Sequence, residues 1–177
     1  AEDWAPFEPD FTDQTWLVTG ATGGIGRAVS LTASAAGATV FAVARADEKL
    51  AALRDEAQAP ERIVPLRADL ASMAEVAALA EREAMADVTV DVLVNNVGVL
   101  LNEFDATDEG FERSFATNLL GHWVLTESLY SAGNLAGDGL VVEVSSGGMY
   151  GTPLRLEPMD CRDAGDHDGM TAYAMHK

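Results

Sequence analysis

Short apolar runs alternate along this chain with longer stretches in which apolar residues recur every three or four positions. The alternation predicts an α/β fold, with a parallel sheet covered by helices on both faces. Right-handed crossovers would then place a ligand crevice at the carboxyl ends of the strands. The predicted strands are 16–18, 39–43, 63–66, 88–94 and 140–144, and the predicted helices are 27–36, 47–57, 72–86, 108–131 and one that opens at 169–171.

Single residues mark several of these boundaries. Gly37 suits the C′ position that ends the first helix. Ser72 is a predicted N-cap, with Glu75 at the capping-box position. Pro65 interrupts the third strand, which places that strand at a sheet edge or the proline at a strand end, because proline cannot donate to a ladder.

Residues 1–13 combine aromatic residues with prolines. Proline disfavours a helix here and the aromatic side chains need cover, so we expect an extended arm laid on the domain. Residues 14–177 then form one domain, since 48% hydrophobic residues in a chain of 177 suffice for one core. The aromatic residues of the arm are Trp4, Phe7 and Phe11.

Acidic residues outnumber basic ones by 29 to 11, which gives a formal net charge of −18, and Lys49 and Lys177 are the only lysines. Such a surface repels nucleic acid and anionic membranes, so neither partner is expected. At ~1 M salt the Debye length falls to about 3 Å and the self-repulsion is screened. The composition is similar to that of proteins from salt-loving organisms; an acidic protein of an ordinary cytoplasm is the alternative.

The compartment expected from the sequence is the cytoplasm. No apolar run reaches the ~18 residues of a membrane span, and residues 1–4 lack the features of a signal peptide. The single cysteine, Cys161, rules out an internal disulfide and a cysteine-rich zinc site, and it fits a reducing environment. We expect a structural free thiol there and no metal site.

A glycine-dense turn joins the first strand to the first helix. This arrangement presents free backbone N–H groups and a positive helix end to a phosphate. Gly20 permits the tight turn, Gly24 lets a pyrophosphate approach the backbone, and Gly26 lets the helix pack closely on the strand. We expect Thr22 and Ile25 of the same turn to contact a dinucleotide as well; an ordinary glycine-rich loop is the alternative.

Polar residues also follow the second and fourth strands, where the crevice is expected. Arg45 stands where an arginine would grip a ribose 2′-phosphate and an acid would bind the 2′-hydroxyl; a solvated surface arginine is the alternative. Asn95 and Asn96 end the fourth strand, just before Gly98. Two amides there can hold neighbouring loops by backbone hydrogen bonds and line the floor of a cofactor site.

One long predicted helix carries an apolar stripe interrupted by an amide. A buried amide costs several kcal/mol unless it is satisfied, so something polar must meet Asn118. His122, one turn later, is expected to be a packed histidine rather than a ligand. The stripe comprises Phe111, Phe115, Asn118, His122, Leu125 and Leu129.

Tyr173 and Lys177 stand four positions apart on the last predicted helix, so their side chains share one face. A tyrosine hydroxyl has a pKa of about 10, and an adjacent ammonium lowers that pKa by stabilising the phenolate. The pair can then give or take a proton near neutral pH. Taken alone, a tyrosine and a lysine at this spacing often occur by chance. Here the pair follows the glycine turn, the paired asparagines and the asparagine within a helix.

In this order the motifs resemble those of the short-chain dehydrogenase/reductase family. The family's T-G-x-x-x-G-x-G turn begins at Thr19, and its N-N-A-G element is residues 95–98, with Val97 in place of alanine. The resemblance implies a Rossmann-like doubly wound sheet. It also implies an NAD(P)-dependent oxidoreductase that moves a hydride between nicotinamide and a small-molecule carbonyl or alcohol, in a parent protein expected to be a homo-oligomer.

The resemblance further implies a catalytic tetrad. In the family the serine bonds the substrate oxygen, the tyrosine is the acid/base, the lysine holds the nicotinamide ribose, and the asparagine orders a proton-relay water. The matching residues are Asn118, Ser146, Tyr173 and Lys177.

Cofactor choice is implied by the residues after the second and third strands. Ala44 occupies the position of the family's ribose-binding acid, so Arg45 favours NADP over NAD. Asp69, with Leu70 beside it, matches the aspartate that caps the family's adenine pocket. As a loop acid just before a helix, Asp69 is equally suited to start that helix.

Two departures from the family pattern bear on function. The 27 residues from Ser146 to Tyr173 exceed the usual spacing, so 147–169 is expected to be an enlarged substrate flap. The chain also stops at Lys177, after five strands, and so resembles the cofactor half of a longer enzyme. A dinucleotide-binding module without turnover is the alternative function; a purely structural acidic protein has no use for a complete tetrad.

Overall fold

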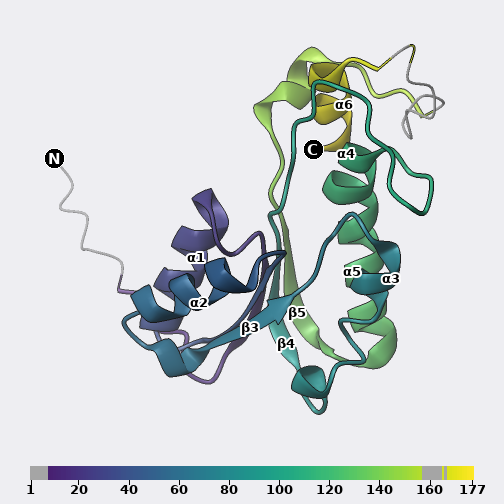
Figure 1. Cartoon of the computed structure of the whole chain (residues 1–177). Helices are drawn as coiled ribbons and strands as arrows, with labels where there is room; N and C mark the ends of the chain where they lie inside the picture. Colours follow the sequence, from purple (N-terminus) through teal and green to yellow (C-terminus); the bar gives the residue numbers. More distant parts are fainter. Residues whose placement is uncertain (1–7, 157–164, 166) are drawn as a thin grey trace, which may run out of the picture.

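The computed structural model describes residues 8–156, 165 and 167–177 of the chain. Its centre is a five-stranded sheet in the order β3-β2-β1-β4-β5, with every neighbouring pair parallel (Figure 1). This confirms the predicted α/β fold. The strands are β1 (Thr15–Thr19), β2 (Thr39–Ala44), β3 (Ile63–Arg67), β4 (Val90–Asn95) and β5 (Leu135–Glu143).

Helices cover both faces of the sheet. Figure 1 shows α1 (Gly24–Ala35) and α2 (Asp47–Glu56) on one face, and α3 (Met73–Ala77) and α5 (Gly121–Ala132) on the other. Successive strand residues point to opposite faces, so each face has its own core. Val18, Val40 and Leu50 belong to one core, and Leu17, Phe41 and Leu125 to the other.

The predicted boundary residues act largely as expected. Gly37 follows α1 with φ +100°, and β3, which contains Pro65, is an edge strand. The Ser72 hydroxyl accepts a hydrogen bond from the Glu75 backbone N–H at 3.3 Å. The reciprocal half of the capping box is not formed, because the Glu75 carboxylate instead accepts from the Asp69 backbone N–H at 3.1 Å.

Two predicted helices start or end elsewhere. The helix expected over 72–86 is α-helical only through α3; turns closed by hydrogen bonds between residues three positions apart follow it, then a 3₁₀ helix η2 (Glu83–Met85). The helix expected from 108 begins with α4 (Arg113–Phe115), because Gly110 at φ +85° turns the chain and the Glu112 carboxylate caps the helix. It continues through a π-helical turn, η3 (Ala116–Leu120), into α5.

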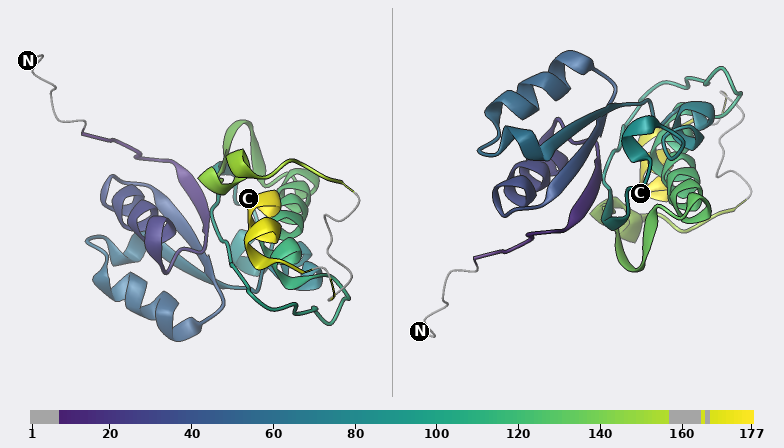
Figure 2. Two further views of the ribbon diagram at one scale, coloured as in Figure 1. Left: turned by 90° about the horizontal axis from the view of Figure 1, so that it is seen from above. Right: turned by 90° about the horizontal axis from the view of Figure 1, so that it is seen from below.

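The last segments lie beyond the carboxyl ends of the strands. β5 starts five residues earlier than expected, at Leu135, and leads to η4 (Gly147–Gly151). Helix α6 (Gly169–His176) packs on α4, as both views in Figure 2 show. Residues 157–164 and 166 of the predicted flap, Cys161 included, lie outside the described residues.

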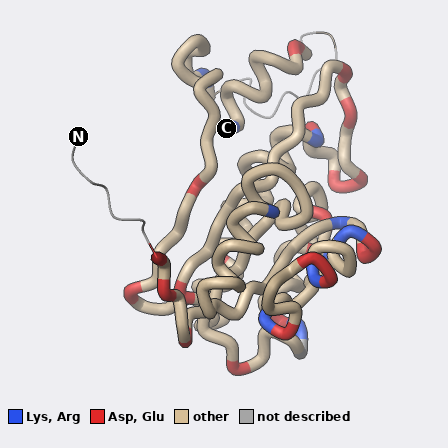
Figure 3. Tube along the Cα trace, turned by 90° about the vertical axis from the view of Figure 1, so that its left-hand side faces the viewer, with Lys and Arg blue, Asp and Glu red and all other residues tan. Residues whose placement is uncertain are grey.

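The start of the described chain contacts the domain. The Phe11 ring lies 4.8 Å from that of Trp16, and its backbone N–H donates to Ala36 O at 2.8 Å. Trp4 and Phe7 lie outside the described residues. Acidic positions are spread along the trace and far outnumber basic ones (Figure 3). Among the described residues no helix is long and apolar enough to cross a membrane.

Candidate functional site: a cleft at the carboxyl ends of the strands

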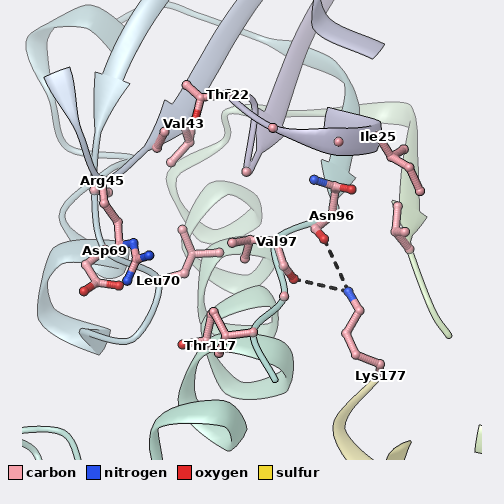
Figure 4. Close-up of a pocket in the computed structure, with 18 of the residues that line it drawn as sticks. Thr22, Ile25, Val43, Arg45, Asp69, Leu70, Asn96, Val97, Thr117 and Lys177 are labelled. Carbon is pink, nitrogen blue, oxygen red and sulfur yellow. Dashed lines mark hydrogen bonds between the residues drawn. The ribbon is translucent and has the colours of Figure 1, made fainter. Parts of the chain in front are cut away.

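A cleft of about 590 Å³ opens where all five strands end. The residues directly after each strand line it, and α6 closes one side (Figure 4). Most of the residues singled out in the sequence meet here, from positions up to 157 apart in the chain. The predicted residues that line the cleft are Gly20, Thr22, Gly24, Ile25, Arg45, Asp69, Leu70, Asn96, Gly98, Ser146, Tyr173 and Lys177.

The glycines of the turn after β1 differ in what surrounds them. Gly20 and Gly24 have φ of +63° and +49°, a region that side chains rarely adopt. A Cβ on Gly26 would lie 2.4 Å from Gly20 O and 2.5 Å from the Asn96 amide nitrogen, so the start of α1 is packed directly on the turn and on the residue that follows β4. Among the residues that the structure describes, nothing lies within 4 Å of a Cβ on Gly23 or Gly24, and this open side has room for a phosphate.

Thr19 joins the ends of β1 and β4, a role that the sequence did not reveal. Its hydroxyl accepts from the backbone N–H groups of Asn96 at 2.9 Å and Val97 at 3.1 Å, and donates to Val94 O at 3.2 Å. The Asn96 amide returns a bond to Thr19 O at 2.9 Å. The predicted backbone bonds of Asn96 are therefore formed. The sequence marks Thr19 as the first residue of the T-G-x-x-x-G-x-G turn, but not its bonds to the end of β4.

Arg45 and Asp69 point into the same end of the cleft, away from Lys177 (Figure 4). Lys49 of α2 also lines the cleft, so the cleft wall contains two cationic side chains from α2 and its entry loop, whereas Arg54 of α2 does not line it. Asp69 Oδ1 accepts from the Ala71 backbone N–H at 3.0 Å, which organises the turn before α3. Asp69 thus faces the cleft and shapes the helix start together, so the two interpretations are compatible.

Three predicted residues lie behind the cleft instead of lining it. Gly26 is packed under the turn, as described above. The buried Asn95 amide points away from the cleft, donating to Glu143 Oε1 at 2.6 Å and Thr126 Oγ1 at 3.1 Å, and so ties β4 to β5 and α5. Asn118 is also buried and makes two bonds to the backbone of Val99, accepting at 2.7 Å and donating at 2.8 Å.

The polar partner expected for the buried Asn118 amide is therefore the backbone of the loop after β4. Asn118 lies within the π-helical turn η3, a distortion that often accompanies functional sites. Val99 itself lines the cleft, so Asn118 supports the cleft wall from behind. His122, further along the same stripe, is 95% buried, and within the described residues its Nε2 has no hydrogen-bond partner.

Burial lowers the pKa of His122 to about 3, with a smaller contribution from the charge of Lys177. A Glu143 carboxylate oxygen lies 3.7 Å from Nδ1 and would favour the charged ring. That side chain is 58% exposed, so water screens its charge and desolvation of the ring dominates. His122 is a neutral packed histidine near pH 7, as expected.

Lys177 is held against the backbone at the end of β4. Its Nζ donates to Val97 O at 3.2 Å and to Asn96 O at 3.4 Å (Figure 4), and its stem lies against Gly98. Burial lowers the pKa of Lys177, and the charge of Glu143 opposes this shift. Ser145, which the sequence did not single out, donates to the Lys177 carbonyl.

Several further residues of the cleft wall carry no signal in the sequence. They are mostly apolar or small, and such residues become recognisable only when the fold brings them to a cleft. They include Val43, Val99, Thr117 and Val144.

Comparisons with known proteins agree with this geometry. The short chain dehydrogenase family model matches residues 14–154. Dehydrogenase/reductase SDR family member 12 of Bos taurus is 32% identical over 183 residues, covering 100% of this chain and 57% of that protein. The chain spans about half the length of the curated relatives it matches.

Solved structures show the same fold. The crystal structure of an uncharacterised protein from Mycobacterium paratuberculosis matches with a TM-score of 0.83 at 29% identity, over 96% of this chain and 59% of that one. A short chain dehydrogenase from Burkholderia cenocepacia in complex with NADP matches with a TM-score of 0.72 at 25% identity, over 94% of this chain and 64% of that one. The family model covers most of the chain, and it covers the glycine turn, the strand ends and Ser146 within the cleft. The chain therefore belongs to the short-chain dehydrogenase/reductase family of oxidoreductases.

Proposed function

We propose that this chain supplies the cofactor site and catalytic tetrad of an NADP-preferring oxidoreductase acting on a small-molecule carbonyl or alcohol. One observation carries the proposal: Ser146, Tyr173 and Lys177 line the same cleft as the glycine turn. The NADP bound to the related Burkholderia cenocepacia protein supports a nicotinamide dinucleotide as the ligand.

Binding is assigned along the length of the cleft. The open side of Gly23 and Gly24 at the start of α1 receives the pyrophosphate, whose charge suits the backbone N–H groups and the helix end. Arg45 and Lys49 bind the 2′-phosphate, and Asp69 with Leu70 encloses the adenine. Lys177, fixed by two backbone carbonyls, lies at the opposite end and binds the nicotinamide ribose.

The proton is handled at that opposite end. A bound nicotinamide supplies or accepts the hydride. Ser146 Oγ orients the substrate oxygen, and the Tyr173 hydroxyl gives it a proton in reduction or takes one in oxidation. Asn118 holds the Val99 backbone in place beside them. In this scheme Asn118 also orders a water through which the proton reaches solvent.

Nucleotide binding and Tyr173 dependence test the proposal together. NADPH fluorescence should report binding, and its absorbance should fall when a panel of carbonyl compounds is added. Tyr173→Phe should abolish this oxidation and leave NADPH affinity nearly unchanged, because the pyrophosphate and 2′-phosphate contacts remain. Binding with no Tyr173-dependent turnover would support the alternative, a dinucleotide-binding module; absence of NADPH binding would reject both.

Cofactor preference is tested separately at Arg45. Loss of one charge-assisted phosphate contact costs about 1.5–3 kcal/mol, or roughly 10–150-fold in affinity. Arg45→Asp should therefore weaken NADPH binding by that factor and reverse the preference towards NADH. Arg54→Asp makes the same charge change on α2 outside the cleft lining and is the matched control. Equal affinities of the unchanged protein for NADPH and NADH would contradict the assignment of Arg45.

A further inference from the structure

A buried chain of polar side chains lies outside the cleft, between α4 and α6. Glu112, Ser114 and His176 are each at most 2% exposed. The Glu112 carboxylate accepts three hydrogen bonds: from the backbone N–H groups of Ser114 at 2.8 Å and Phe115 at 2.7 Å, and from Ser114 Oγ at 2.5 Å. Cleft binding does not account for this group, since none of the three residues lines the cleft.

The protons of this chain can be assigned from its geometry. Ser114 has one hydroxyl proton, and the Glu112 carboxylate accepts it. Ser114 Oγ also lies 3.2 Å from His176 Nδ1, so it must act as the acceptor in that contact. His176 therefore carries a proton on Nδ1 and donates it to Ser114. The Phe115 ring contacts the imidazole edge-on, with centroids 5.4 Å apart, and helps to fix its orientation.

His176 belongs to the inner face of α6. Gly169, Ala172 and His176 recur at helical spacing and are buried, whereas Tyr173 and Lys177 lie on the neighbouring face that lines the cleft. The rotation of α6 about its axis decides where these two side chains point. A contact that fixes the inner face therefore also fixes Tyr173 and Lys177.

The opposite end of α6 is fixed by close packing. A Cβ on Gly169 would lie 2.0 Å from Leu101 O, and His167 Nε2 lies 3.1 Å from the same oxygen. Backbone contact thus fixes the start of α6. At the other end of α6, the Ser114–His176 bond and the Phe115 ring contact hold the helix to α4. α4 is continuous with the π-helical turn that carries Asn118. The Ser114–His176 bond therefore joins α6, which carries Tyr173 and Lys177, to the helical segment that carries Asn118.

We propose that the Glu112–Ser114–His176 chain is a positioning device that sets the rotation of α6 and aims Tyr173 and Lys177 into the cleft. The inference rests on the proposed function for its catalytic meaning, but its geometric part does not depend on any bound nucleotide. Ser114 and His176 act through α6 and are positioning residues, not catalytic ones. Because nucleotide affinity comes mainly from the pyrophosphate and 2′-phosphate contacts, the device should affect turnover far more than binding.

The test uses tyrosine labelled with ¹³C, because the chain has only three tyrosines. In protein without nucleotide, Ser114→Ala should shift or broaden the Tyr173 signal, assigned with Tyr173→Phe, and leave that of Tyr130 on α5 unchanged. Ser114→Ala keeps both backbone bonds to Glu112. Ser34→Ala is the matched control: it removes a buried helical serine hydroxyl, bonded to Leu31 O at 3.1 Å, that is remote from α6.

Turnover gives the second readout. Misplacement by about 1 Å costs up to ~100-fold in rate, so Ser114→Ala should lower kcat by about 10–100-fold while the Kd for NADPH changes less than about threefold. His176→Asn places an amide donor where Nδ1–H was, so it should keep the Tyr173 signal and kcat close to those of the unchanged protein. His176→Leu has no donor and should alter both. If Ser114→Ala does not fold, the Leu and Asn variants at 176 decide between the outcomes.

The outcomes separate the two proposals. A Tyr173 signal and kcat that stay as in the unchanged protein in both Ser114→Ala and His176→Leu would overturn the positioning role. Equal effects of His176→Asn and His176→Leu would also overturn it, because only bulk would then matter. If the unchanged protein neither binds NADPH nor turns over, the proposed function fails, and the Tyr173 signal alone then decides whether the device exists.

Discussion

At the scale of single residues, the glycines of the turn after β1 serve different purposes. Gly26 has no room for a side chain, since its Cβ would meet backbone at 2.4 Å. Gly23 has open space and an extended backbone with φ −150°, which any residue adopts. Gly26 is thus required for folding, whereas Gly23 matters only for the phosphate group that would approach the turn from outside.

Gly26→Ala should therefore destabilise the protein, because the contacts of its Cβ are with backbone and with an amide held by Thr19. Overpacking of this kind costs about 1–3 kcal/mol. Gly23→Ala should leave stability within about 0.5 kcal/mol but weaken NADPH binding, because the new methyl group occupies the phosphate side of the turn. Urea unfolding and NADPH titration of both variants are the measurements. Equal stabilities of the two variants would contradict the packing argument.

His122 should make the protein sensitive to acid. Its pKa is lowered to about 3 in the folded chain, against about 6.5 when unfolded. Between these values the unfolded chain binds a proton that the folded chain excludes, so stability falls as pH falls through this window. At about 1.4 kcal/mol per pKa unit, the drop from pH 6.5 to 4.5 is about 2–3 kcal/mol.

Replacement of the ring isolates this contribution from that of the many carboxyl groups. His122→Leu fills the same buried site without a titratable group. The free energy of unfolding should therefore fall less from pH 6.5 to 4.5 in the variant than in the unchanged protein, by about 2–3 kcal/mol. The measurement is urea unfolding of both proteins at both pH values. Parallel pH curves would show that His122 does not titrate in this way.

The residues predicted from sequence are those whose chemistry is visible locally. A glycine turn, paired asparagines and a Y-x-x-x-K spacing are each recognisable within a few positions. The bonding role of Thr19 and the pairing of Ser114 with His176 are not recognisable locally, because Thr19 bonds Val94 75 positions away and Ser114 and His176 lie 62 positions apart. Asn95 was assigned to the wrong side of β4, since a strand-end amide reaches either a loop or the neighbouring strand.

At the scale of elements, those marked by local sequence signals are predicted, and those set by distant contacts are not. Strands β1 to β4 and helices α1 and α2 follow from apolar runs and end signals, and the structure has them within a few residues of the prediction. The start of β5 was missed because a tertiary contact sets it: the Asn134 amide donates to Met85 O at 2.9 Å and to Val88 O at 2.8 Å. No pattern near residue 134 encodes these partners.

The π-helical turn is the element whose support can be tested most directly. Asn118 satisfies both backbone groups of Val99. Asn118→Ala would leave the part-buried N–H and C=O of Val99 without this partner, at about 1–3 kcal/mol for each group not reached by water. The variant should lose about 2–3 kcal/mol and exchange the Val99 amide hydrogen faster. Asn102→Ala, at an exposed position of the same loop, is the control and should change neither. An unchanged exchange rate at Val99 would refute this account of the loop.

At the scale of the whole molecule, the order of the strands explains why distant motifs meet. With β1 central and every strand parallel, the five segments that follow the strands emerge at one edge. The alternation of strands and helices along the sequence predicts this convergence. It did not predict how α6 would be fixed against the edge, because that depends on side chains of α4.

The net charge acts on the molecule as a whole. With −18 charges and few basic residues on a domain of this size, folding brings like charges together. Salt screens this repulsion, with a Debye length of about 10 Å at 0.1 M and 3 Å at 1 M. The melting temperature should therefore rise between dilute buffer and molar potassium chloride, by about 2–4 °C for each kcal/mol of repulsion relieved.

Charge reversal on the surface separates screening from other effects of salt. Asp55 on α2 and Glu127 on α5 are exposed on opposite faces of the molecule. Changing both to lysine moves the net charge from −18 to −14. The variant should melt at a higher temperature in dilute buffer and gain less from potassium chloride, because less repulsion is left to screen. If salt raises both melting temperatures equally, the stabilisation comes from exclusion of salt from the protein surface, and the net charge does not limit the stability of this fold.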